Sequence, residues 1–156
     1  GSSTPMKNIE TFTQYALRTY NVLDIAYPGA GNLTPERIEY IRQDFSDFEK
    51  VLYSYDYNTE PYAWWNLADM DSFADYFLLH EFTCNYDVGS RSTYMYKDLR
   101  GTYKMCIWDF NSACDNFYES QLKPQRFQLQ NITWFYMILK QTITMRCFRI
   151  IMMTPG

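Results

Sequence analysis

The sequence predicts a mostly helical α+β domain with one short β-hairpin. Two observations carry this prediction: apolar residues repeat at helical spacing over much of the chain, and two short alternating runs flank a glycine-containing turn. Of the 156 residues, 47% are hydrophobic and 21% are charged, so the chain can bury one core. We therefore expect a single domain over residues 1–156, with residues 1–3 left over from an expression tag.

Two amphipathic helices are expected in the first third of the chain. Apolar residues spaced like one helix face predict a helix over residues 7–23, and the turn at residues 28–31 follows it. The next helix has the clearer signal, because Thr34 is a good N-cap and Pro35 suits the first helical position. Its apolar face consists of Ile38, Ile41, Phe45, Phe48, Leu52 and Tyr55. This face should pack into the core.

Two further helices are predicted in the second half of the chain. Asp71 and Ser72 open the first of them, which should end near Asn85. Its buried side carries the aromatic residues Phe73, Tyr76, Phe77 and Phe82. A last helix should begin near Asn131. Its apolar residues are Ile132, Phe135, Leu139 and Ile143.

The charge and cysteine content of the chain limit the kinds of function that the sequence allows. The net charge is -4, which argues against non-specific nucleic-acid binding, and no apolar stretch is long enough to span a bilayer. Residues 120–156 contain five basic residues and no acidic one. One interpretation of this segment is a basic helix that packs against an acidic part of the domain. The other is a basic surface that binds a membrane or a phosphate group. The four cysteines, Cys84, Cys106, Cys114 and Cys147, are either reduced or form up to two disulfides in any of three connectivities.

The predicted hairpin places two acidic residues near one another. Its strands are expected within residues 93–97 and 103–108, around the turn at residues 98–101. Because a hairpin folds its two ends together, Asp87 before the first strand should approach Asp109 after the second. Two carboxylates with substrate phosphates suit Mg²⁺ or Mn²⁺, and phosphoryl transfer uses such an arrangement. The alternative is that both residues only occupy turns, where Asp is common.

The segment over residues 71–111 resembles the CotH kinase family, which is named after a spore coat protein. The matching motifs are an Asn-x-Asp that ends at Asp87, a Tyr-x-Tyr strand that begins at Tyr94, and a Trp-Asp-Phe-Asn over residues 108–111. The resemblance covers about residues 34–140. It implies a fold similar to the C-terminal lobe of a protein kinase.

The resemblance also implies a chemistry. It implies ATP as phosphate donor, Mg²⁺ or Mn²⁺ as metal, and a coat or surface protein as substrate. Asp87, with Asn85 beside it, would act on the acceptor hydroxyl, while Asp109 and Asn111 would hold the metal. The cofactor-binding candidates are Lys97, Lys104 and Ser92.

This chain departs from the family pattern at two positions. Ser92 stands where many members have Asn, and Asn111 stands where many have Asp, which is a stronger metal ligand. The segment before Thr34 is also short for a nucleotide-covering lobe, so we expect the C-terminal half of a longer kinase that is inactive alone. The alternative is a degenerate, non-catalytic binding or structural module. Either form is expected at a bacterial surface, secreted, or in a spore coat.

Overall fold

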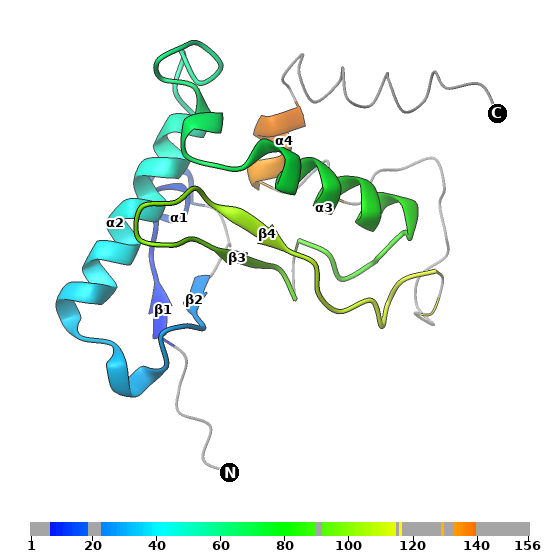
Figure 1. Ribbon diagram of the computed structural model, residues 1–156, viewed down its shortest axis with the longest axis horizontal. Helices are drawn as coiled ribbons and strands as arrows, with labels where there is room; N and C mark the ends of the chain where they lie inside the picture. Colours follow the sequence, from blue (N-terminus) through cyan, green and yellow to red (C-terminus); the bar gives the residue numbers. More distant parts are fainter. Residues whose placement is uncertain are drawn as a thin grey trace. The chain divides into compact units, whose positions relative to one another are not determined.

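A two-stranded antiparallel sheet accompanies the helices in each of two units of the chain, residues 1–55 and residues 56–156 (Figure 1). The structure is a computed structural model. It describes residues 7–18, 23–89, 92–114, 116, 129 and 133–139. The predicted α+β class is confirmed, but a second sheet accompanies the expected hairpin.

The first unit begins with a strand, a short helix and a second strand. These are β1 (Lys7–Ile9), α1 (Phe12–Leu17) and β2 (Leu23–Ile25), followed by the 3₁₀ turn η1 (Ala30–Asn32). The predicted helix over residues 7–23 is therefore wrong outside α1. Ile9 and Ile25 are buried from paired antiparallel strands, and Arg18 ends α1 in the left-handed conformation, with φ 52°. A short apolar pattern does not distinguish a helix from a strand. Here the residues on both sides of α1 form paired strands.

The long helix of the first unit is α2 (Pro35–Leu52), close to its predicted extent. The Thr34 side chain accepts a hydrogen bond from the Arg37 backbone N–H at 3.3 Å, which confirms the predicted N-cap. Phe45, Phe48 and Leu52 are buried as expected. Tyr55 is the exception, because it lies beyond the end of the helix and is fully exposed.

A completely buried carboxylate joins α1 to α2. Glu49 of α2 is 0% exposed, and it accepts hydrogen bonds from the Thr13 backbone N–H at 2.9 Å and the Thr13 hydroxyl at 2.7 Å. The Phe12 N–H donates to the Ser46 hydroxyl at 3.2 Å. Side chains of α2 thus satisfy backbone N–H groups that the first turn of α1 leaves without helical partners.

The second unit contains η2 (Trp64–Asn66), α3 (Met70–Phe82), β3 (Tyr94–Tyr96), β4 (Lys104–Cys106) and α4 (Thr133–Leu139). The predicted hairpin is confirmed: β3 and β4 are antiparallel, with Tyr94 opposite Cys106. The Asp69 side chain caps α3 by accepting from the Ser72 N–H at 3.0 Å. Phe82 was expected to be buried but is 88% exposed, because α3 ends there and its side chain leaves the apolar face.

In the second unit the hairpin lies on one side of α3 and α4 lies on the other (Figure 1). On the hairpin side, the Ser72 hydroxyl accepts from the Met105 N–H at 2.9 Å. On the α4 side, the Phe135 ring lies 5.9 Å from Phe73 and 5.8 Å from Tyr76, measured between ring centroids. Hydrogen bonds therefore hold the hairpin against α3, while aromatic packing holds α4.

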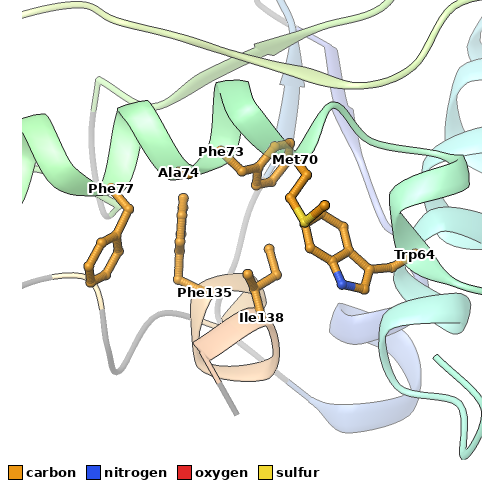
Figure 2. Close-up of a pocket in the computed structure, with 7 residues that line it drawn as sticks. All are labelled: Trp64, Met70, Phe73, Ala74, Phe77, Phe135 and Ile138. Atoms are coloured by element: carbon orange, nitrogen blue, oxygen red, sulfur yellow. The ribbon is translucent and has the colours of Figure 1, made fainter. Parts of the chain in front are cut away.

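A small apolar pocket lies between α3 and α4 (Figure 2). Its lining residues are Trp64, Met70, Phe73, Ala74, Phe77, Phe135 and Ile138. Its volume is about 10 Å³, which is room for one water molecule and not for a nucleotide. It is a packing gap in the core of this unit.

Several expectations from the sequence lie outside the described residues. These are the basic residues of the C-terminal tail, Cys147, and the helix positions Asn131, Ile132 and Ile143. Among the helices that the structure describes, none has both the length and the apolar character needed to cross a membrane.

Candidate functional site

The open end of the hairpin holds Asp109. The Ser92 hydroxyl, which precedes β3, donates to Asp109 Oδ2 at 2.9 Å, and the Asn111 backbone N–H donates to Asp109 Oδ1 at 3.2 Å. Both carboxylate oxygens are therefore fixed by groups from the same end of the hairpin. Ser92 and Asn111, two of the predicted site residues, lie beside Asp109.

The backbone at this end of the hairpin turns through unusual conformations. Asp109 has φ 57°, Ser92 has φ 48° and Gly89 has φ 79°. Positive φ is uncommon for residues with a β-carbon, although Asp and Asn adopt it more readily than most. The carboxylate of Asp109 is thus presented from a tight, left-handed turn rather than from a strand.

The segment that carries Asp87 lies against the segment that carries Asp109. Asn85 Nδ2 donates to the Asp109 backbone carbonyl at 2.9 Å, and the Tyr86 N–H donates to the Ser112 carbonyl at 3.3 Å. The Ser112 hydroxyl in turn donates to Asp87 Oδ2 at 2.7 Å. The hairpin therefore does bring the stretches of chain around the two aspartates together, and it does so through Asn85 and Ser112.

His80, near the end of α3, contacts both of these segments, through Asn85 in one and Phe110 in the other. It is 1% exposed, and its ring is stacked on Phe110 with 4.7 Å between centroids and a 4° angle between planes. The Tyr76 ring, tilted by 53°, has its centroid 4.2 Å from that of His80. Its Nδ1 faces Asn85 Nδ2 at 3.1 Å, so Nδ1 is the acceptor and Nε2 carries the proton. Burial lowers the pKa of His80 from 6.5 to about 4, which keeps the ring neutral near pH 7.

Sequence reasoning missed both His80 and Ser112. The signal for His80 was available, because it falls on the same face of α3 as Tyr76, one turn further along. A lone histidine on an aromatic face is more often a packed core residue than a ligand, as it is here. Nothing in the sequence singles out Ser112, since a serine after a turn has no distinctive spacing.

The oxygen atoms at this site suit a hard divalent cation in type but not in number. Within the described residues, no group of three or more His, Cys, Asp or Glu side chains is placed to hold a metal. The carboxylates of Asp87 and Asp109 are supplemented by Asn85 Oδ1, which is buried and has no hydrogen-bond partner. Mg²⁺ commonly takes one or two carboxylates and completes its shell with water and substrate phosphates. The described residues therefore offer oxygen atoms of the right type, but they do not form a complete metal site.

The two candidate lysines lie at the other end of the hairpin. Lys104 is paired with Tyr96 next to the turn, and its ammonium lies 3.6 Å from an Asp69 carboxylate oxygen. The Lys97 ammonium lies 4.8 Å from the centre of the Tyr103 ring. The fold does not bring these lysines to the open end, where Ser92 meets Asp109.

Comparison with known proteins gives one match. No curated protein and no solved structure matches the chain. The family described as CotH kinase protein matches residues 17–152, which is most of the sequence and includes every candidate site residue. The resemblance predicted from the motifs is therefore confirmed, and the chain belongs to the CotH kinase family.

Proposed function

We propose that this chain forms the catalytic part of an atypical protein kinase, which transfers phosphate from ATP to a Ser or Thr hydroxyl of a protein. Family membership supports this proposal, as does one structural observation. Asn85 donates to the backbone of Asp109 while Ser112 donates to Asp87, so two carboxylate-bearing segments are fastened to each other. Phosphoryl transfer depends mainly on such positioning, because the protein has little covalent work to do.

Asp87 is the acceptor-side residue in this proposal. Its carboxylate is half-buried, and the Ser112 hydroxyl fixes one of its oxygens at 2.7 Å. A fixed carboxylate can align an incoming hydroxyl and accept its proton as the bond to phosphorus forms. Asn85, buried just before it, holds the loop in place.

Asp109 is the metal-side residue in this proposal. Ser92 and the Asn111 N–H hold its two oxygens in one orientation. The side-chain oxygens of Asn85 and Asn111 supply neutral ligands beside it. A divalent cation at this place would neutralise charge on the nucleotide phosphates.

The candidate site has no lysine placed to bind the nucleotide phosphates among the residues that the structure describes. Lys97 and Lys104 are the phosphate candidates, but either would have to leave the Tyr103 ring or the Asp69 carboxylate to reach the open end of the hairpin. In this proposal, α3 and the hairpin belong to a kinase-like C-terminal lobe. We therefore expect the chain on its own to transfer little phosphate, while it still binds metal and nucleotide weakly.

Calorimetry with Mn²⁺, in the presence and absence of ATP, tests the proposal. We expect heat with Mn²⁺ and ATP together, loss of that heat in Asp109→Asn, and retention of it in Asp87→Asn, because Asp87 serves the acceptor. Asp98→Asn is the matched control, since Asp98 is an exposed acid in the hairpin turn. Absence of any metal- or nucleotide-dependent heat, or unchanged heat in Asp109→Asn, would contradict the proposal.

A second candidate function is a non-catalytic binding or structural module of the same family. Asn111 in place of an acid and the engagement of Lys97 and Lys104 favour it. In either case we propose a protein partner at a bacterial surface, in the secreted fraction, or in a spore coat, because the family is associated with spore coats. The calorimetric result separates the two functions.

A further inference from the structure

We infer that Cys84 and Cys114 are a covalent modification site, at which an oxidant of the disulfide class joins the two thiols. The bond would close the segment that carries both candidate aspartates. This inference stands on the backbone geometry of the second unit and holds whether or not the chain transfers phosphate.

One backbone hydrogen bond brings the two cysteines within bonding range. The Cys114 N–H donates to the Thr83 carbonyl at 2.6 Å, and that carbonyl carbon is joined directly to the nitrogen of Cys84. The path between the two Cα atoms is thus one N–Cα bond, one short hydrogen bond and one peptide group, which limits their separation to about 7 Å. Disulfides in proteins usually join Cα atoms about 4.4–6.8 Å apart.

A second hydrogen bond sets the direction of the two segments. The Tyr86 N–H donates to the Ser112 carbonyl at 3.3 Å. Together with the bond from Cys114 to Thr83, it means that one segment runs forward while the other runs back. The two bonds differ by one residue in register, and Cys84 and Cys114 have φ 48° and 53°, so two tight turns meet here and not two strands. The short bond from Cys114 to Thr83 is therefore the contact that brings Cys84 and Cys114 close together.

The remaining cysteines are less suitable partners. Cys106 belongs to β4, where its strand partner is Tyr94. The Cys84 thiol lies against the Glu81 carbonyl at 3.6 Å, so it must turn away from that oxygen to reach Cys114. Cys147 lies outside the described residues. Cys114 is exposed and Cys84 is partly exposed, so an oxidant can reach the pair. Of the three connectivities that the sequence leaves open, the geometry selects one containing the Cys84–Cys114 bond.

The chemistry is thiol–disulfide exchange. The exposed Cys114 thiolate attacks a small disulfide such as oxidised glutathione, forms a mixed disulfide and releases one glutathione thiol. The Cys84 thiolate then attacks the Cys114 sulfur and releases the second glutathione. Two cysteine thiols lose two protons and two electrons, and one small disulfide is reduced to two thiols.

The position of the bond gives it a structural consequence. It would close a loop that begins just before Asn85 and ends just after Ser112, so Asp87, the hairpin and Asp109 all lie inside it. A closed loop restricts the unfolded chain and so stabilises the folded one. The two segments that now depend on a few hydrogen bonds would be covalently joined.

Peptide mapping by mass spectrometry under non-reducing conditions tests the inference on the intact chain. Reduced protein is incubated with oxidised glutathione, and the expected product is one linked pair of peptides containing Cys84 and Cys114. Cys106→Ser is the matched control and should give the same link. Repeating the oxidation in concentrated urea should lose this preference, because the native backbone no longer holds the two residues together.

Three results would overturn the inference. The first is a link through Cys106 or Cys147 in most of the native product. The second is Cys84 and Cys114 ending as separate glutathione adducts, and the third is an unchanged share of the link in urea. All three results are read from the wild-type chain, so the test does not depend on whether any variant folds.

Discussion

Glu49 in the first unit and Asp109 in the second are both acids held by hydrogen bonds, but they are held in different ways. Glu49 is 0% exposed, and its two oxygens accept from the backbone N–H and the hydroxyl of Thr13. Asp109 is half-buried, and its oxygens accept from two residues, Ser92 and Asn111, at the end of a hairpin. The first acid closes a contact inside the fold, whereas the second is presented at the surface.

The difference separates acids that stabilise a fold from acids that are available for chemistry. A buried carboxylate needs donors from the protein itself, and its loss leaves those donors without partners. A half-buried carboxylate remains within reach of water, a cation or a substrate. Burial and the source of the donors therefore indicate the role of each acid more clearly than its place in a motif does.

The largest expected effect comes from breaking the buried contact. Glu49→Ala should lower the free energy of unfolding by about 4 kcal/mol, because the N–H and hydroxyl of Thr13 lose a charged acceptor inside the core. Urea denaturation followed by far-ultraviolet circular dichroism measures this loss.

An exposed acid on the same helix provides the control. Asp47→Ala removes two exposed contacts, the ion pair with Lys50 at 2.9 Å and a hydrogen bond from Gln43 Nε2 at 2.8 Å, and should cost less than about 1 kcal/mol. Equal effects of the two substitutions would mean that burial does not distinguish these acids.

The second-largest expected effect on stability comes from His80, which packs against the candidate site. Because burial lowers its pKa from 6.5 to about 4, the unfolded chain takes up a proton that the folded chain does not as the pH falls between these values. Stability should therefore fall by about 3 kcal/mol between pH 6.5 and pH 4 through this residue alone.

Denaturation profiles of the wild-type chain and His80→Gln measure this effect. Above pH 6.5 the contribution is absent, and the difference between the two proteins should shrink steadily as the pH is lowered. Tyr76, Asn85 and Phe110, which contact the ring, carry no charge in this range. Parallel profiles for the two proteins would show that His80 is protonated normally in the fold.

Of the buried and half-buried groups compared, Asp109 has the smallest expected effect on stability. Asp109→Asn should change the free energy of unfolding by less than about 1 kcal/mol, because Asn adopts positive φ as readily as Asp and retains oxygen and nitrogen atoms for its neighbours. Thermal melting measures this change. A loss as large as that of Glu49→Ala would place Asp109 among the structural acids.

Strong local signals were predictable from the sequence. Thr34 and Pro35 gave the start of α2, and the glycine-containing turn gave the hairpin with its ends together. The approach of the segments carrying Asp87 and Asp109 followed from that hairpin alone. These features depend on residues close together along the chain, so one sequence is enough to infer them.

Features that depend on long-range pairing were not predictable. The strands β1 and β2 replaced an expected helix because each is stabilised by the other, and neither has a distinctive pattern alone. The contact of Ser112 with Asp87 and the burial of Glu49 likewise need a partner from another segment. The burial of Phe82 was predicted wrongly because the apolar face of a helix does not reveal the residue at which the helix ends.

The left-handed backbone at Asp109 also bears on how such a protein could change over generations. Aspartate and asparagine codons differ by a single base, and both residues suit this turn. One mutation could therefore remove the negative charge at the hairpin end while the folded chain persists. Such a change of charge would need only a single step, and selection on folding would not oppose it.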